Sequence, residues 1–127
     1  MTDPTISGII PPLITPMTED LAFDIKAFEK LVEHVISGGI HGIFILGTNG
    51  EGASLTFSTR KNILQESAAL VSGRVPLFVN ISSVSYLETL ELAEYAAGSG
   101  ANYVVLTPPF YFPMDQRELR RYFDCLL

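Results

Sequence analysis

The 127-residue chain has a single cysteine, few basic residues and no long apolar run. Because Cys125 has no second cysteine to pair with, the sequence excludes an internal disulfide and a multi-cysteine zinc site. Eight Lys and Arg against fourteen Asp and Glu give a net charge of −6, which argues against binding to nucleic acid. No run approaches the roughly 18 apolar residues of a membrane span, and the acidic start is unlike a signal peptide. We expect a soluble, cytoplasmic protein that binds neither nucleic acid nor membrane.

What is present is an alternation of short apolar runs with longer amphipathic ones. The apolar runs are continuous, which is typical of strands buried on both faces of a parallel sheet. They predict four strands, over residues 8–14, 42–46, 75–81 and 103–106. Pro11 and Pro12 lie in the first of these and make it an irregular or edge strand.

A helix is predicted after each strand. Apolar residues recur at i, i+3, i+4 and i+7 on one face of each amphipathic segment. The helix starts are marked by residues suited to N-capping: Asp24, Ser85 with Glu88, and Asp115 with Glu118. The first three helices end at glycines: Gly38, Gly73 and Gly98.

Residues 32–48 align without gaps on residues 93–109, so the unit of strand and helix is repeated. The sequence therefore predicts an α/β protein with the order (βα)₄. Two architectures fit this order: an open, doubly wound sheet, or half of a (β/α)₈ barrel, which normally needs about 250 residues. A half barrel has unpaired strand edges that must be covered.

The second predicted strand runs directly into Gly-Thr-Asn-Gly-Glu-Gly, residues 47–52. Exposed N–H groups in a glycine-rich loop form a nest for an anion, and Thr48 and Asn49 add further donors. The spacing is not that of a phosphate-binding loop, no lysine follows, and Glu51 would repel a polyanion. A small carboxylate is the better ligand. The alternative is a plain strand-to-helix turn in which Glu51 is a structural hydrogen-bond acceptor.

Other polar groups follow the remaining strands. Thr15 follows the first, Asn80 and Ser82 follow the third, and "TPPFYFP" (residues 107–113) follows the fourth. Tyr111 in this last loop is a candidate proton donor or relay. The alternative for the loop is aromatic packing or a subunit contact. No set of His, Cys, Asp and Glu has the spacing of metal ligands.

Taken together, "GIIPPLITPM", "GTNGEG" and "PPFYFP" resemble the dihydrodipicolinate synthase/N-acetylneuraminate lyase family. The resemblance runs from about Gly8 to the end of the chain, in register with all four units. It implies a class I aldolase-type (β/α)₈ barrel, of which residues 1–127 are the N-terminal half, without strands five to eight. It also implies a Schiff-base carbon–carbon lyase or synthase, acting on pyruvate or a related 2-oxo acid, with no metal or organic cofactor, and a homo-oligomer.

The resemblance assigns roles to individual residues. Thr48 would belong to a catalytic hydroxyl relay and, with Asn49, would bind the carboxylate of the 2-oxo acid. Tyr111 would shuttle protons to and from the substrate. Asn49 departs from the usual threonine, which leaves substrate choice open. The shape of the loop would depend on three structural residues, Gly47, Gly50 and Glu51.

The imine-forming lysine of the family lies on the sixth strand and is expected to lie outside this sequence. Lys26, Lys30 and Lys61 are predicted at solvent-facing helix positions, unlike a desolvated Schiff-base lysine. We therefore expect the chain alone to be inactive. One alternative is a non-catalytic half barrel that self-associates. A flavodoxin-like domain with a phosphate or flavin site also has this element order, but the acidic loop disfavours it.

Overall fold

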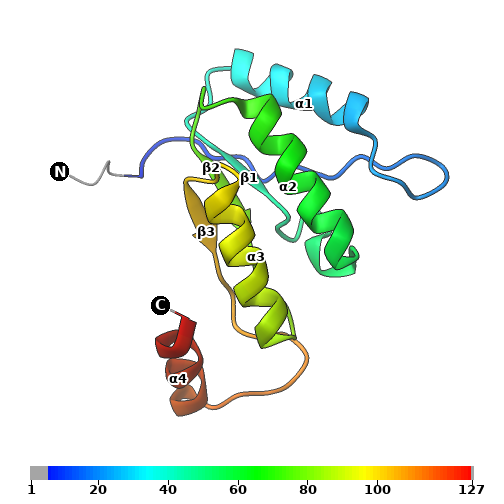
Figure 1. The fold of residues 1–127 in the computed structure, drawn as a ribbon. Helices are drawn as coiled ribbons and strands as arrows, with labels where there is room; N and C mark the ends of the chain where they lie inside the picture. The colour runs from blue at the N-terminus through cyan, green and yellow to red at the C-terminus, as the bar shows by residue number, and fades with distance from the viewer. Residues whose placement is uncertain (1–5, 127) are drawn as a thin grey trace.

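A parallel three-stranded sheet organises the chain, which the computed structural model describes over residues 6–126 (Figure 1). The sheet order is β1-β2-β3, with Ile43 opposite Leu77 and Phe78 opposite Tyr103. The prediction of an α/β protein with a parallel sheet is confirmed. The elements in chain order are α1 (Ile25–Ser37), β1 (Ile43–Ile45), the 3₁₀ helix η1 (Gly52–Ser54), α2 (Phe57–Val71), β2 (Leu77–Asn80), α3 (Tyr86–Gly98), β3 (Tyr103–Val105) and α4 (Gln116–Leu126).

The first predicted strand, residues 8–14, is not a strand of this sheet. It makes a single parallel bridge, between Pro12 and Phe44. The Leu13 N–H donates to the Phe44 carbonyl at 2.8 Å, and the Phe44 N–H donates to the Pro11 carbonyl at 3.1 Å. Because Pro11 and Pro12 have no N–H, the ladder cannot continue. The prediction of a sheet strand over residues 8–14 is therefore wrong. The two prolines, from which an irregular or edge strand was expected, explain why only one bridge forms.

The core lies between the sheet and helices α1, α2 and α3, which cover one face of it (Figure 1). Successive strand residues point to opposite faces. Ile43 and Ile45 of β1 point into the core and are almost fully buried. Phe44, between them, points to the opposite face. There Phe44 and Val105 of β3 line a cavity. The face away from the helices is therefore the one that carries a site.

Side chains cap the first and last helices as the sequence predicts. The Asp24 carboxylate accepts the Ala27 N–H at 3.0 Å, which satisfies a donor of the first turn of α1. At α4 the pair is reciprocal. The Glu118 N–H donates to Asp115 at 2.8 Å, and the Asp115 N–H donates to Glu118 at 2.7 Å. This is a complete capping box.

Helix α4 lies apart from the sheet, at the end of the long connection after β3 (Figure 1). None of its described residues is buried. Its contact with α3 runs through Tyr86, whose hydroxyl donates to the Cys125 carbonyl at 3.1 Å and whose ring lies edge-on to Tyr122. Among the described helices, none combines the length and apolar character needed to cross a membrane.

Candidate functional site

The candidate site begins at Leu46, where the backbone is kinked. Leu46 follows β1, is 1% exposed and has a φ of 60°, a left-handed conformation that is uncommon and costly for a non-glycine residue. The chain then folds back, so that Gly52 lies against the Leu46 carbonyl. A Cβ atom on Gly52 would lie 2.0 Å from that oxygen. Only glycine allows this approach, which fixes the shape of residues 47–52, hereafter the glycine loop.

Backbone hydrogen bonds hold the glycine loop closed. The Glu51 N–H donates to the Thr48 carbonyl at 3.0 Å, and the Gly52 N–H donates to the Gly47 carbonyl at 3.2 Å. The Thr15 hydroxyl donates to the buried Gly50 carbonyl at 2.7 Å, which ties the loop to the segment before α1. The Glu51 side chain is exposed and accepts no hydrogen bond from residues 6–126. Its role as the structural acid of the loop stays a prediction.

The glycine loop leaves donors free at its tip. Thr48 and Asn49 are exposed, and their N–H groups donate to no acceptor within residues 6–126. The Thr48 hydroxyl is a further donor on the same turn. Neighbouring N–H groups that point outward from a turn bind anions, carboxylates included.

A cavity of about 450 Å³ lies beside this loop, at the carboxyl ends of all three strands. Its apolar lining includes Phe44, Val105 and Phe110. Its polar lining comes from residues far apart in the sequence: Thr48, Glu51, Asn80, Ser82 and Thr107. A hollow of this size and composition accommodates a small polar organic molecule.

A hydrogen-bonded chain of side chains forms one wall of the cavity. The Ser82 hydroxyl donates to the Asn80 Oδ1 at 2.7 Å. The Ser82 oxygen accepts the Thr107 N–H at 2.8 Å and lies 3.0 Å from the Thr107 hydroxyl. The Asn80 Nδ2 donates to the Leu46 carbonyl at 2.9 Å. The ends of β2 and β3 are thus linked to the kink before the glycine loop.

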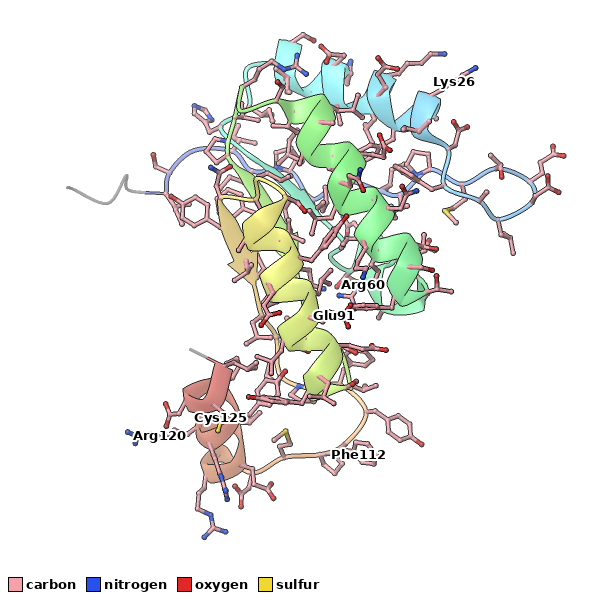
Figure 2. All side chains as sticks on the ribbon, viewed as in Figure 1. Lys26, Arg60, Glu91, Phe112, Arg120 and Cys125 are labelled. Atoms are coloured by element: carbon pink, nitrogen blue, oxygen red, sulfur yellow. The ribbon has the colours of Figure 1, made fainter. Side chains whose placement is uncertain are left out.

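Arg60 lies behind this wall, near the start of α2 where that helix passes α3 (Figure 2). It is 4% exposed, and one guanidinium nitrogen donates to the carbonyls of Asn80 at 3.2 Å and Ser82 at 3.0 Å. Burial lowers the pKa of the Arg60 guanidinium, and the Glu88 carboxylate partly offsets this. Ser85 caps α3 as predicted, since its hydroxyl accepts the Glu88 N–H at 3.4 Å, but the capping box is not reciprocal: Glu88 accepts the Ser83 hydroxyl at 2.7 Å, and the Ser85 N–H donates to Ser83.

Of the residues predicted from the sequence, Gly47, Thr48 and Glu51 line the cavity. Gly50 and Asn49 belong to the same loop but do not line the cavity: Gly50 is buried and Asn49 is exposed. Arg60 was missed because nothing in its local sequence separates it from a solvated helix residue. The sequence predicts Asn80 and Ser82 only as polar residues that follow a strand, and that position is the one sequence signal for their place in the site.

Tyr111 lies outside the cavity. It is 76% exposed and contacts Phe112 edge-on, with ring centroids 4.9 Å apart. It lines a separate hollow on the loop before α4, together with Leu119. Phe110 is the aromatic residue of this loop that reaches the cavity. The proton-shuttling role predicted for Tyr111 stays a prediction.

None of the three lysines lines the cavity. Lys26 and Lys30 are exposed on α1, and Figure 2 shows Lys26 pointing outward from the helix. Lys61 differs from the solvent-facing position expected, because its side chain is only 33% exposed and its ammonium lies 3.0 Å from the Glu91 carboxylate. The ammonium also lies over two aromatic rings, those of Phe57 and Tyr95.

The model of the dihydrodipicolinate synthetase family matches residues 5–127, and the chain belongs to this family. Among curated proteins it is 38% identical over 117 residues to an uncharacterized DapA-like lyase of Thermococcus onnurineus, covering 92% of this chain and 40% of that protein. It is also 38% identical over 116 residues to the 4-hydroxy-tetrahydrodipicolinate synthase of Thermus thermophilus, covering 91% of this chain and 38% of the synthase.

Solved structures agree with this assignment. Dihydrodipicolinate synthase from Bacteroides thetaiotaomicron superposes with a TM-score of 0.91 at 42% identity, covering 96% of this chain and 41% of that one. A prophage protein of Escherichia coli K12 from the same family, in complex with pyruvate, superposes with a TM-score of 0.93 at 33% identity, covering 96% of this chain and 41% of that one. The chain thus spans about two fifths of the length of these relatives.

Proposed function

We propose that this chain forms the carboxylate-binding part of a Schiff-base carbon–carbon lyase or synthase, acting on pyruvate or a related 2-oxo acid. The observation that carries the proposal is the glycine loop, which presents two free N–H groups and the Thr48 hydroxyl beside a cavity at the carboxyl ends of the strands. Membership of the dihydrodipicolinate synthetase family supports it, as does the pyruvate complex of the related Escherichia coli prophage protein.

In this proposal the carboxylate of the 2-oxo acid accepts hydrogen bonds from the N–H groups of Thr48 and Asn49 and from the Thr48 hydroxyl. Bonds from such donors to a charged oxygen are stronger than bonds between neutral groups. The keto carbon then lies over the part of the cavity lined by Phe44 and Val105. The Glu51 carboxylate beside the cavity opposes ligands of higher negative charge. The site therefore favours a small monoanion over a phosphorylated one.

The reaction we propose joins or cleaves a carbon–carbon bond through an imine, with neither a metal nor an organic cofactor. We propose that the imine-forming lysine lies outside residues 1–127 and that this chain alone is inactive. The surroundings of its lysines support this, since Lys26 and Lys30 are exposed and Lys61 is paired with Glu91. The Thr48 hydroxyl and Tyr111 would take part in proton transfer once the full site is assembled.

We also propose that residues 1–127 are the N-terminal half of a (β/α)₈ barrel, and that the protein lies in the cytoplasm. The parallel order β1-β2-β3 and the helices on one face of the sheet fit such a segment. So does the share of the two relatives that the chain spans, 40% and 38%. The second substrate stays open, because the relatives include both a 4-hydroxy-tetrahydrodipicolinate synthase and a probable 2-dehydro-3-deoxy-D-pentonate aldolase.

Titration calorimetry with pyruvate and with methyl pyruvate tests the carboxylate pocket. The two ligands share the keto group and differ in the charge of the carboxylate. We expect the chain to bind pyruvate and not the ester. Equal binding of both ligands, or binding of neither, would contradict the proposal.

A borohydride trap tests the place of the nucleophile. After incubation with pyruvate and borohydride, we expect the intact mass to remain at 13.9 kDa, with no adduct. A pyruvyl adduct would show that an amine of this chain forms the imine. Peptide mapping would then identify whether it is Lys26, Lys30, Lys61 or the N-terminal amine.

A second candidate function is a non-catalytic half barrel that pairs with a second copy of itself. It is favoured by the outer edge of β3, which pairs with no strand other than β2 within residues 6–126, and by Val104, which is 48% exposed. Two copies could cover each other's strand edges. Sedimentation velocity distinguishes the candidates. A dimer that persists at micromolar concentration would support pairing, and a monomer at all concentrations would exclude it.

A further inference from the structure

We propose that Asn80 is a positioning residue for the glycine loop: by holding the Leu46 carbonyl, it fixes the conformation in which Thr48 and Asn49 lie at the tip of the loop, beside the cavity. Asn80 lies on β2, 34 residues along the chain from Leu46. The inference about the loop stands on the hydrogen bonds of the structure. Its consequence for ligand affinity rests on the function proposed above.

The Leu46 carbonyl is held from two sides. The Asn80 Nδ2 donates to it at 2.9 Å, and Gly52 packs so closely that a Cβ atom there would lie 2.0 Å from the oxygen. This carbonyl belongs to the same planar peptide unit as the Gly47 N–H. Fixing the oxygen therefore fixes the direction in which the chain leaves the strand toward Thr48.

Leu46 needs such an anchor because its backbone is not in a relaxed conformation. A buried leucine with a φ of 60° persists only when its surroundings hold it there, at a cost of about 1–3 kcal/mol. Without the Asn80 donor, the buried carbonyl would lose its side-chain partner and the strained peptide unit could rotate. The N–H groups of Thr48 and Asn49 would then lose their fixed positions at the tip of the loop.

The orientation of the Asn80 carboxamide is itself fixed. Its Oδ1 accepts the Ser82 hydroxyl at 2.7 Å and the Ser82 N–H at 3.3 Å, so its Nδ2 is left to donate to Leu46. The Ser82 oxygen in turn accepts the Thr107 N–H at 2.8 Å. From behind, Arg60 donates to the backbone carbonyl of Asn80 at 3.2 Å. Ser82 therefore holds the carboxamide directly, while Thr107 holds Ser82 and Arg60 holds the Asn80 backbone.

The test compares Asn80→Ala with a matched variant, Asn102→Ala. Asn102 also makes a carboxamide-to-backbone bond, since its Oδ1 accepts the Leu77 N–H at 2.9 Å, but at the amino end of β2. Asn80→Asp is the second variant: it keeps the shape and the acceptor for Ser82 but removes the donor to Leu46. Each purified chain is examined without ligand by amide NMR and by hydrogen exchange of the Glu51 and Gly52 amides, which are bonded within the loop.

We expect both Asn80 variants to shift the Thr48 and Asn49 resonances and to speed exchange at Glu51 and Gly52 about two- to tenfold, the effect of losing one hydrogen bond. Pyruvate affinity should fall by a similar factor. Asn102→Ala should leave these amides unchanged, whatever its effect on the melting temperature.

Unchanged Thr48 and Asn49 resonances in folded Asn80→Asp would overturn the inference, and so would equal shifts in Asn102→Ala. These readings need no ligand. If the unsubstituted chain fails to bind pyruvate, the proposed function fails while the role of Asn80 is still decided by the ligand-free spectra.

Discussion

The two ends of the sheet use polar side chains in different ways. At the amino ends, a hollow of about 100 Å³ is lined by Ile10, Phe78 and Tyr103, among others. Nearby polar groups there satisfy the backbone: His41 Nδ1 accepts the Ile9 N–H at 3.0 Å. At the carboxyl ends the cavity is about 450 Å³, and its edge carries a strained residue, Leu46, and N–H groups without protein partners.

The difference indicates where this fold carries function. Strained backbone and unsatisfied donors lower stability, so they are retained where a ligand uses them. At the amino ends the left-handed residue is Ser72, the exposed C-cap of α2, and the side chains around the hollow there serve packing. We expect changes at the carboxyl ends to alter binding, with or without a change in stability, and changes elsewhere to alter stability alone or nothing.

The largest effect is expected from Gly52→Ala, because the new Cβ atom would lie 2.0 Å from the Leu46 carbonyl. Overpacking against backbone should lower the free energy of unfolding by about 3 kcal/mol. Gly98→Ala is the matched control, since a Cβ atom there meets nothing within 4 Å, and it should be neutral or stabilising by up to about 1 kcal/mol. Urea unfolding measures both. Similar stabilities for the two variants would contradict the tight approach at Gly52.

The next largest effect is expected from Arg60→Met. This change keeps an apolar stem but removes the donor to the carbonyls of Asn80 and Ser82. Hydrogen bonds from a charged group lead us to expect a loss of about 2 kcal/mol in the free energy of unfolding. Arg120→Met, at a side chain that is 85% exposed, should change it by less than about 0.5 kcal/mol. Equal free energies of unfolding for the two variants would show that the hydrogen bonds from Arg60 do not stabilise the fold.

A smaller effect, on binding only, is expected from Thr48→Val. The exposed hydroxyl makes no hydrogen bond within residues 6–126, so the free energy of unfolding should change by less than about 0.5 kcal/mol. Pyruvate affinity should fall about tenfold, the effect of losing one bond to a charged oxygen. Calorimetry and urea unfolding of the same sample separate the two. A loss of stability without a loss of affinity would show that Thr48 serves the fold.

The smallest effect is expected at the ion pair between Glu33 of α1 and Arg74, whose guanidinium donates to the carboxylate at 2.9 Å. The hydrogen bond from Arg74 lowers the pKa of the Glu33 carboxyl below its ordinary 4.5. The pair therefore stabilises the fold above the unfolded-state pKa and loses this contribution as the pH falls through the folded-state value. Thermal melts from pH 6 to pH 3 should show a slightly steeper loss for the unsubstituted chain than for Glu33→Gln. If the melting temperatures of the two chains fall in parallel as the pH is lowered, the ion pair does not contribute to stability.

Much of the fold could be predicted because its determinants are local. Continuous apolar runs, caps such as Asp24 and Asp115, and terminal glycines specified the order of strands and helices. The first strand was the exception. Its apolar residues predict a strand, but Pro11 and Pro12 remove the donors that a ladder needs, and only one bridge remains.

The candidate site also has a part that could be predicted from the sequence and a part that could not. The glycine loop could be predicted because its residues are consecutive. The support from Asn80 and Arg60 could not, because the bonds to Leu46 and Ser82 join residues 34 and 22 positions apart. Tyr111 could be predicted as a candidate but not located, because its ring packs against Phe112 of its own loop and stays 76% exposed.

A residue-by-residue NMR titration of the chain with pyruvate tests whether the carboxyl ends of the strands bind a 2-oxo acid. It distinguishes the two ends of the sheet in one experiment. We expect the Thr48 and Asn49 amides to shift with increasing pyruvate, and the amides of His41 and Tyr103, at the amino ends, to stay in place. Shifts at the amino ends, or none at the glycine loop, would contradict the claim that the carboxyl ends carry a 2-oxo acid site.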